Sequence, residues 1–376
     1  MIGQAQLFSD DLTYESPSTE GIKYAGSKLK LIPHILQLAR KVAATTVFDG
    51  FSGTTRVSQA FAQCGYDVVC NDQAVWSEVF GTCYLKGRAP QEYQALIEQL
   101  NALAPKDGWF TKFYGGDPKI MEQPKRPWQT HNTRKLDAIR EEIDRLSLDP
   151  IDKCVALTSL IRALDQVDST LGHFASYLRE WSPRSYNSLR LRVPAIVANG
   201  RPHAHRVHRA DIFGLLDDIE SDIAYYDPPY GSNNEKMPPS RVRYASYYHL
   251  WTTICLDDRP TLFGKVNRRT DTSDIVVNSP FEDFRRGPDG KFIAVEAIRK
   301  LLTATRSKYI ILSYSSGGRA TSENLNEVIE SCGKLLEVVE VDYRRNVMAG
   351  MKWTNEWLRD AEAPNREFLF LIARHC

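Results

Sequence analysis

The sequence lacks several features that would assign it to a specialised class of protein. No apolar run approaches the roughly 20 residues of a membrane-spanning helix, and the first residues, with Asp10, Asp11 and Glu15, lack the basic-then-apolar pattern of a signal peptide. The seven cysteines form no CxxC pair, which favours reduced thiols in the cytoplasm over a disulfide framework or a zinc site. What remains is the composition of an ordinary globular protein, with 42% hydrophobic and 25% charged residues in a chain of 376.

Acidic residues are missing from one stretch of the chain. The segment 81–210 contains 20 Lys and Arg against 14 Asp and Glu, and residues 181–210 contain no acid at all. The arginines of this stretch are Arg184, Arg190, Arg192, Arg201, Arg206 and Arg209. Such a local excess favours a surface that faces a polyanion. The alternative is a solvated face whose acidic partners lie elsewhere in the fold.

Short apolar segments alternate with helix-like segments in two parts of the chain. The segments that read as strands are 45–51, 66–72, 205–214, 222–230, 308–316, 335–343 and 367–374. Alternation of this kind predicts an α/β fold with a mostly parallel sheet covered by helices on both faces. The last two strands have no helical pattern between them and are expected to be antiparallel. Residues 1–20 lack periodicity and are expected to form a loose tail, while the part between the second and third strands is helical and loop-like.

Polar residues follow the predicted strands, where ligands bind in an open sheet of this kind. After the first strand come Asp49, Gly50, Ser52 and Gly53, a turn through which the backbone can closely approach a ligand. Asp72 follows the second strand and is suited to accept hydrogen bonds from ribose hydroxyls, or alternatively to cap a helix.

The fourth predicted strand ends at Asp227-Pro228-Pro229-Tyr230. Neither proline can donate a backbone hydrogen bond, so the strand stops there with a stiff, extended backbone. The Asp227 carboxylate and the Pro228 carbonyl then present two adjacent acceptors, which suit a group with two N–H donors such as an exocyclic amine. Tyr230 offers an aromatic face to a planar heterocycle. The alternative is a bare turn with a capping aspartate.

Taken together, these segments resemble the D12 class of adenine-specific DNA methyltransferases, which includes the Dam methylases. The resemblance lies in KYAGSK (23–28), VFDGFSGTTRVSQAF (47–61), CND (70–72), DPPYG (227–231) and EFLFLIAR (367–374). It implies the class I S-adenosylmethionine-dependent methyltransferase fold, with an antiparallel last strand and a mainly helical insert. The implied division is a catalytic domain of 21–80 and 205–376 and a target-recognition insert of 81–204. The insert is longer than the Dam type needs, so the resemblance does not give the DNA sequence that it recognises.

The resemblance also implies roles for individual residues. S-adenosylmethionine would be bound by Tyr24, Lys28, Asp49, Gly50, Ser52, Gly53, Asp72 and Asp211, and double-stranded DNA by Arg184, Arg190, Arg192, Arg201 and Arg206. Asp227, Pro228 and Tyr230 would hold a target adenine flipped out of the duplex. Aromatic residues farther along the chain would either wall this pocket or belong to the core: Tyr244, Tyr247, Tyr248 and Phe281.

Three other functions fit the same motif. It serves N4 methylation of cytosine equally well, since that amine needs the same two acceptors. RNA is an alternative substrate, and a DNA-binding module without activity is an alternative of a different class. A restriction endonuclease is a possible partner of such a methyltransferase.

Overall fold

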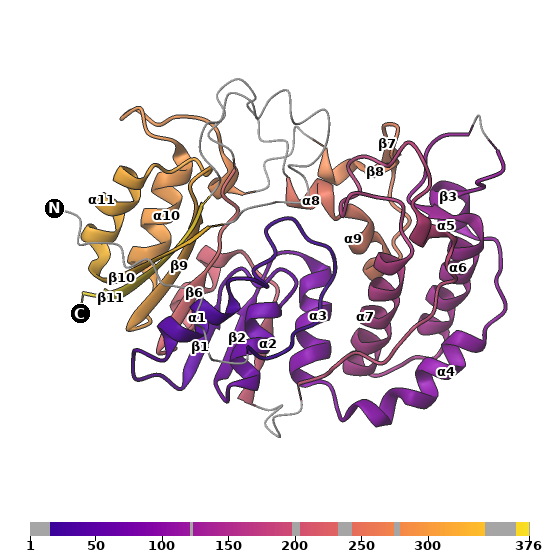
Figure 1. Ribbon diagram of the computed structural model, residues 1–376, viewed down its shortest axis with the longest axis horizontal. Coiled ribbons are helices and arrows are strands. Elements are labelled where there is room, and N and C mark those ends of the chain that lie inside the picture. The colour runs from indigo at the N-terminus through magenta and orange to yellow at the C-terminus, as the bar shows by residue number, and fades with distance from the viewer. Residues whose placement is uncertain are drawn as a thin grey trace.

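The structure is a computed structural model, and it describes residues 16–120, 123–197, 204–231, 243–273, 279–342 and 366–375. A seven-stranded sheet forms one part of the molecule, and a group of helices lies beside it (Figure 1). No helix in these ranges is long and apolar enough to cross a membrane. The same ranges contain no group of three or more His, Cys, Asp and Glu side chains that is arranged to hold a metal ion.

The sheet confirms the predicted fold class. In spatial order its strands are β10 (Gly333–Asp342), β11 (Arg366–Arg374), β9 (Tyr309–Ser315), β6 (Ile223–Tyr226), β1 (Thr46–Asp49), β2 (Asp67–Asn71) and β5 (Arg206–His208). Neighbours from β9 to β5 pair in parallel, whereas β11 is antiparallel to both β9 and β10. Each strand overlaps a segment that the sequence predicts to be a strand.

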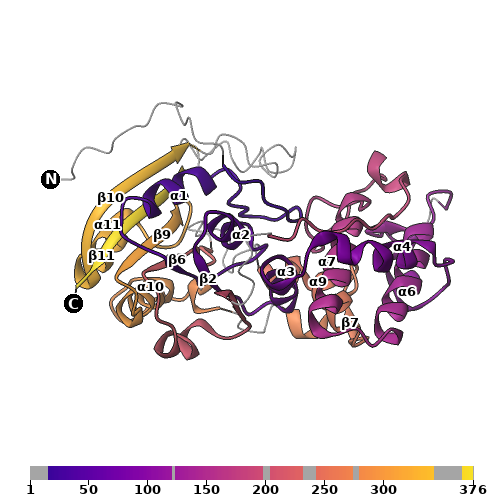
Figure 2. The same cartoon turned by 90° about the horizontal axis from the view of Figure 1, so that it is seen from below.

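Helices cover both faces of the sheet, because alternate side chains of each strand point to opposite sides. The helices are α1 (Ile32–Ala39), α2 (Arg56–Gln63), α10 (Ile293–Ala304) and α11 (Ser322–Cys332). Val47 and Ile223 pack with α1 and α2, whereas Phe48 and Ala224 pack with α10 and α11. Figure 2 shows α1 and α2 on one side of the sheet and α10 on the other. The strands are buried on both faces, as parallel strands usually are.

The second group of helices shares one apolar core that is built from two parts of the chain. The first part contributes α3 (Val75–Lys86), α4 (Gln94–Ala102), α5 (Trp109–Tyr114), α6 (Thr130–Arg145) and α7 (Pro150–Gln166). The second part contributes α8 (Tyr244–Tyr247), α9 (His249–Leu256) and a hairpin of β7 (Leu262–Phe263) and β8 (Arg268–Arg269). Tyr248 and Trp251 of this second part are buried in the same core as Phe80 and Leu160 of the first part. We name this group of helices the helical region, and it includes residues that follow the DPPY motif as well as those of the expected insert.

Short helical turns and one small sheet complete the described structure. They are η1 (Pro90–Tyr93), η2 (Pro183–Tyr186), η4 (Ile212–Gly214), η5 (Leu216–Asp218), η6 (Thr270–Thr272), η7 (Pro280–Glu282), β3 (Gly115–Gly116) and β4 (Trp128–Gln129). The expected N-terminal tail falls mostly outside the described residues. Its last residues lie against α2, where Gln63 donates to the Ser18 carbonyl at 2.8 Å and the Gln59 carboxamide accepts from the Glu20 N–H at 2.9 Å.

Candidate functional site

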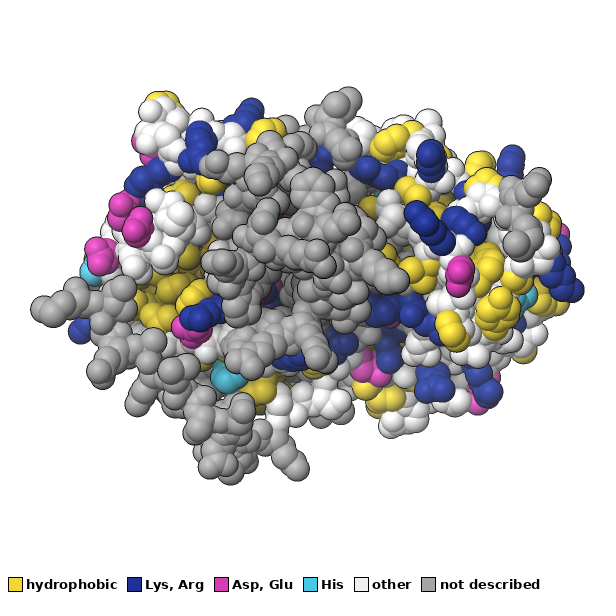
Figure 3. Space-filling model, turned by 45° about the horizontal axis from the view of Figure 1, so that its top comes forward, with side chains coloured by type: hydrophobic (Ala, Val, Ile, Leu, Met, Phe, Trp, Pro, Cys, Tyr) yellow, Lys and Arg dark blue, Asp and Glu magenta, His cyan; other side chains and the backbone are white. Residues whose placement is uncertain are grey.

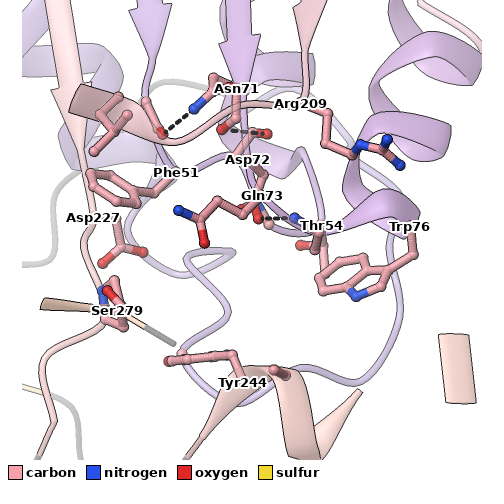
Figure 4. A pocket seen from close by; sticks show the side chains of 18 of the residues that line it. Phe51, Thr54, Asn71, Asp72, Gln73, Trp76, Arg209, Asp227, Tyr244 and Ser279 are labelled. Carbon is pink, nitrogen blue, oxygen red and sulfur yellow. Dashed lines mark hydrogen bonds between the residues drawn. The ribbon is translucent and has the colours of Figure 1, made fainter. Parts of the chain in front are cut away.

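A cavity of about 620 Å³ lies at the carboxyl ends of β1, β2 and β6. Its walls come from the turns after these strands, from the beginning of α3 and from residues around α8 and η7. Figure 4 shows Asp227 on one side of this cavity, Trp76 on the opposite side and Tyr244 from α8 closing a third side. An open parallel sheet places its ligands at this position.

The turn after β1 brings its backbone to the cavity wall. Gly50 has no room for a side chain, because a Cβ atom there would lie 2.7 Å from the ring of Tyr226. Gly53 has a φ of +47°, a left-handed conformation that glycine adopts without steric cost. The Ser52 hydroxyl lies 3.2 Å from the Asn71 carbonyl oxygen, to which it donates, and so ties the turn to β2. Gly50, Ser52 and Gly53 all line the cavity, as the sequence predicts.

Asp49 ends β1 with a buried carboxylate. One oxygen, Oδ2, accepts a hydrogen bond from the Ser58 hydroxyl at 2.6 Å, whereas the buried Oδ1 has no hydrogen-bond partner among the described residues. Burial raises the pKa of Asp49 to about 7, and the nearby charges of Asp227 and Asp72 contribute to the rise. Asp49 lines the cavity, and a buried carboxylate there is suited to a cationic N–H donor.

Asp72 follows β2 and binds two backbone groups. Its Oδ2 accepts from the Gly53 N–H and its Oδ1 from the Ala74 N–H, each at 2.9 Å. Burial raises its pKa, while these hydrogen bonds act in the opposite direction. The carboxylate thus joins the glycine turn to the start of α3. A carboxylate offers about four lone-pair sites, so a ribose hydroxyl can still donate to Asp72, and its place on the cavity wall is compatible with that role.

Asp211 lies on the same wall after β5. Its Oδ1 caps η4 by accepting from the Phe213 N–H at 2.9 Å, and its Oδ2 accepts from the Gln73 side chain at 2.7 Å. Asn71 joins this loop to the glycine turn, since its amide donates to the Gly50 carbonyl at 3.4 Å and to the Ala210 carbonyl at 3.2 Å, and its Oδ1 accepts from the Ala210 N–H at 3.0 Å. Asn71 is a site residue that the pattern of the sequence did not identify, although a polar side chain at the end of a buried strand is a signal for it.

The DPPY motif contributes Asp227 and Pro229 to the cavity wall. The Asp227 carboxylate is 17% exposed, and its Oδ1 lies 3.1 Å from Lys28 Nζ. Tyr230 turns its hydroxyl toward the same oxygen and donates to it. Lys28 Nζ also contacts the Tyr230 hydroxyl at 2.7 Å and Glu367 Oε2 on β11 at 3.5 Å. The expected stacking face of Tyr230 does not line the cavity in this structure, so stacking on a base stays a prediction.

Aromatic side chains form much of the wall opposite the DPPY motif. The ring of Tyr24 lies 5.4 Å from that of Tyr244 and 5.6 Å from that of Trp76, and all three residues line the cavity. Phe281 also lines it. Tyr247 and Tyr248 belong to the core of the helical region. The sequence did not single out Trp76, whose position at the start of α3 places it beside Asp72 in the same wall.

The predicted DNA-binding arginines do not lie together. Arg184 contacts Asp168 Oδ1 at 2.8 Å and the Thr170 carbonyl at 2.8 Å. It therefore has an acidic partner from elsewhere in the fold, as expected for a solvated face and not for a surface that binds a polyanion. Arg206 is exposed at the start of the edge strand β5, and Arg201 lies outside the described residues. Arg209 lines the cavity.

Arg190 and Arg192, which we name the far-side arginines, are exposed on a segment between α4 and α7. Leu191 accepts from and donates to Asn101 at the end of α4, and the Arg192 carbonyl accepts from Ser159 of α7 at 2.7 Å. The segment continues to Val197, whose N–H donates to the Tyr84 carbonyl at 2.9 Å near the end of α3. Since α3 starts at the cavity and is about 18 Å long, this segment leads away from the cavity.

The charge around the cavity favours a cationic ligand. Asp49, Asp72, Asp211 and Asp227 line it, and Asp49 has an oxygen without a partner among the described residues. The cations that line it are engaged by protein oxygens: Lys28 by Asp227, Arg56 by the Thr19 carbonyl, Arg209 by Glu78 and Arg269 by Asp258. A ligand with a positive charge and an aromatic ring fits this combination of carboxylates and aromatic side chains.

Comparisons with known proteins agree with this geometry. A family model described as D12 class N6 adenine-specific DNA methyltransferase matches residues 24–301. The modification methylase StsI of Streptococcus sanguinis is 28% identical over 346 residues, which cover 86% of this chain and 48% of that protein. The type II methyltransferase M.NlaIII of Neisseria lactamica is 28% identical over 339 residues, which cover 86% of this chain and 92% of that protein. The type II methyltransferase M.FokI of Planomicrobium okeanokoites is 24% identical over 344 residues, which cover 86% of this chain and 49% of that protein. The chain therefore spans about half the length of StsI and M.FokI and most of M.NlaIII.

Proposed function

The chain belongs to the D12 class N6 adenine-specific DNA methyltransferase family, and we propose that it methylates the N6 amine of adenine at a specific site in double-stranded DNA. The observation that carries this proposal is the position of Asp227: its carboxylate lies on the wall of the same cavity as the glycine turn and Asp49. An amine acceptor and a nucleotide-type binding turn thus face one space. Methyl transfer needs this arrangement, because the donor and the target must meet in line.

We propose that the methyl donor is S-adenosylmethionine, and the residues present fit it. The unsatisfied Oδ1 of Asp49 suits the ammonium of its amino acid part, and Asp72 suits its ribose. Tyr24 and Trp76 offer apolar walls for its adenine ring. When bound, this cofactor supplies a methyl group on a positively charged sulfur, which is already activated for displacement.

The protein's part in the reaction is to position and polarise the target amine. Asp227 and the Pro228 carbonyl accept its two N–H hydrogens, which directs the nitrogen lone pair toward the methyl group. The donor, held by Asp49 and Asp72, would supply the methyl group to this lone pair, and its sulfur would keep the electron pair of the S–C bond. The amine then carries a positive charge and loses one proton, for which Asp227 is the nearest base. Burial raises the pKa of Asp227, which strengthens it as a proton acceptor, while Lys28 acts in the opposite direction.

The target adenine must leave the duplex to reach this cavity, at a cost of a few kcal/mol. We propose that Tyr230 turns toward the base when DNA binds and stacks on it, worth about 1–3 kcal/mol. In the structure the Tyr230 ring packs against Tyr314 at 4.8 Å and its hydroxyl bonds Asp227. Stacking therefore requires this hydroxyl contact to rearrange.

We infer that the duplex lies across the β7–β8 hairpin of the helical region. Arg269, Asp271 and Thr272, at the end of the hairpin and just after it, line the cavity. Asn267 in its turn donates to the Phe113 carbonyl at 2.7 Å, and Tyr177 donates to the Val266 carbonyl at 2.8 Å. Next to these contact points three basic side chains are exposed, which we name the hairpin-side basic face: Lys112, Arg179 and Lys265.

This basic face has the charge that a DNA backbone requires. In Figure 3, Lys and Arg side chains are scattered over the right-hand part of the molecule, where the helical region lies. Because the hairpin beside this face reaches the cavity through Arg269, we propose that a duplex held on the face presents one base to the cavity. We therefore propose that target recognition involves residues 244–269 as well as the insert of 81–204, and that residues 21–80 and the rest of 205–376 form the catalytic domain.

The names of the relatives, type II methyltransferases and modification methylases, lead us to propose a role in restriction–modification. In that role the protein would protect cytoplasmic DNA from a cognate restriction endonuclease. Purified protein, S-adenosylmethionine with a labelled methyl group and equal amounts of duplex DNA, single-stranded DNA and RNA provide the test. Transfer to duplex DNA is expected. Transfer to RNA alone, or to none of the three, would overturn the proposal.

A further inference from the structure

A buried group of four side chains lies behind the target-amine position, and two of its members come from opposite ends of the chain. Lys28 precedes α1, and Glu367 lies near the start of β11. The other two, Asp227 and Tyr230, belong to the DPPY motif. The side chains of Lys28, Asp227 and Glu367 are only 7%, 17% and 13% exposed. One ammonium is thus shared by two carboxylates away from solvent.

Lys28 contacts every other member of this group. Its Nζ lies 2.7 Å from the Tyr230 hydroxyl, 3.1 Å from Asp227 Oδ1 and 3.5 Å from Glu367 Oε2. Because the Tyr230 oxygen accepts from Lys28, its own proton is directed to Asp227 Oδ1. The Tyr230 hydroxyl also lies 3.4 Å from Glu367 Oε2 and 3.2 Å from Ser313 on β9.

The contacts of Lys28 and Tyr230 with Asp227 therefore both fall on Oδ1. The other oxygen, Oδ2, remains for the target amine. An ammonium that served Asp227 alone would neutralise the carboxylate and weaken it as an acceptor and as a base. Glu367 also contacts that ammonium, at 3.5 Å, so the group as a whole keeps an excess of one negative charge when both carboxylates are ionised.

We propose that Glu367 is a positioning residue of the methyl transfer, which draws part of the Lys28 charge away from Asp227 and so keeps the Asp227 carboxylate a strong hydrogen-bond acceptor and base, aimed at the target amine. This inference rests on the proposed function, since it assigns a role within that reaction. Burial raises the pKa of both Asp227 and Glu367, and Lys28 opposes the rise in each. The ionisation of the two carboxylates is therefore coupled through one lysine.

Other ionisable groups surround Asp227, and the pH dependence of activity must be interpreted with all of them. Those that interact with its charge are Tyr24 and Lys28 before α1, Asp49 at the end of β1, Tyr225 on β6, Tyr230 after β6, Tyr244 on α8 and Glu367 on β11. Burial raises the pKa of each of these tyrosines, so they stay neutral near pH 7. The groups that change charge at and below pH 7 are the three carboxyls.

Two substitutions move the pH profile in opposite directions. In Glu367→Gln, Lys28 no longer shares its charge with Glu367, so the pKa of Asp227 falls and the acidic limb of the kcat profile moves to lower pH. In Lys28→Met, the two carboxylates lose their cation, so the limb moves to higher pH. If the two substitutions only disturbed packing, they would lower kcat at every pH. They would not shift the acidic limb in opposite directions.

The test measures kcat and KM for duplex DNA from about pH 5.5 to about pH 8.5, with calorimetry of S-adenosylmethionine as a separate readout. Glu367→Gln is expected to lower kcat about tenfold near pH 7, with KM and cofactor affinity unchanged. Glu337→Gln is the matched control, because Glu337 on neighbouring β10 pairs with Lys41 at 2.6 Å away from the cavity. It is expected to leave kcat and the profile as in the wild type.

Wild-type kinetics in Glu367→Gln, or limbs that move the same way in Glu367→Gln and Lys28→Met, would overturn the proposal. Should Glu367→Gln fail to fold, as judged by its melting temperature, the direction of the shift in Lys28→Met decides. Asp227→Ala separates this result from the proposed function. In one outcome the wild type is active and Asp227→Ala is inactive, while Glu367→Gln has the same kcat and pH profile as Glu337→Gln. That combination would remove only the role of Glu367. A wild type that methylates no DNA would remove the proposed function and this inference with it.

Discussion

Replacing Asp49 with asparagine should weaken the binding of S-adenosylmethionine and also remove a pH dependence from the stability of the cofactor-free protein. Asp49 is 1% exposed, and burial raises its pKa from 3.8 to about 7. That rise corresponds to a cost of roughly 4 kcal/mol for the ionised form. The folded carboxyl holds its proton more tightly than the unfolded one. Its contribution to the free energy of unfolding is therefore greatest below about pH 4 and is lost as the pH rises to about 7.

Binding should show the opposite trend. The ionised carboxylate is the form that pairs with the ammonium of the cofactor, so the wild-type affinity should increase as the pH rises through about 7. Asp49→Asn loses a hydrogen bond to a charged group, about 1.5–3 kcal/mol, and with it this increase in affinity. Asparagine still accepts from Ser58, so the local fold is retained.

Melting temperatures and calorimetry between about pH 5 and about pH 7.5 measure both effects. Asp218→Asn, a change at an exposed carboxylate of η5, is the control and should follow the wild type. The reasoning is refuted when Asp49→Asn binds the cofactor as tightly as the wild type at pH 7.5, or when it keeps the wild-type pH dependence of affinity.

Three further changes test separate parts of the site. Asp72→Ala should weaken S-adenosylmethionine binding by about 1–3 kcal/mol, since ribose hydroxyls lose their acceptor; an unchanged dissociation constant in calorimetry would leave Asp72 only its bonds to the backbone. Charge reversal of the hairpin-side basic face should lower the affinity for duplex DNA and reduce its salt dependence. The same change in the far-side arginines should lower the affinity less. Equal losses of affinity in a salt titration would reject this placement of DNA. Tyr230→Phe should keep kcat within about tenfold, because it retains the ring face that stacks on the base, and Tyr230→Ala should lose more, because it loses that face; equal kinetics of the two variants would exclude stacking.

The sheet and its binding turns could be predicted because local sequence encodes them. Each strand is a short apolar run, and the residues that line the cavity lie at the ends of four of them or in the turns that follow. Asp49, Gly50, Gly53, Asp72, Asp211 and Asp227 were all identified in this way, and all line one cavity. The family that these motifs suggest is confirmed by the match across residues 24–301.

The contacts between distant segments could not be predicted from local patterns. Glu367 reaches Lys28 only because β11 inserts between β9 and β10, and the strand order is not encoded in periodicity. The partner of Arg184 was equally hidden, since the acid-free stretch gave no indication that Asp168 would fold back on it. Residues 244–269 join the helical region for the same reason: their apolar faces match a core whose other half lies before the DPPY motif.

The identity of the methylated base, with and without Asp227, tests the central claim most directly. Duplex DNA is incubated with S-adenosylmethionine and either wild-type protein or Asp227→Ala, digested to nucleosides and separated by chromatography with mass detection. We expect N6-methyldeoxyadenosine from the wild type and none from Asp227→Ala, while the variant keeps the wild-type melting temperature and duplex affinity. Only N4-methyldeoxycytidine in the wild-type digest, or full activity of Asp227→Ala, would contradict the account.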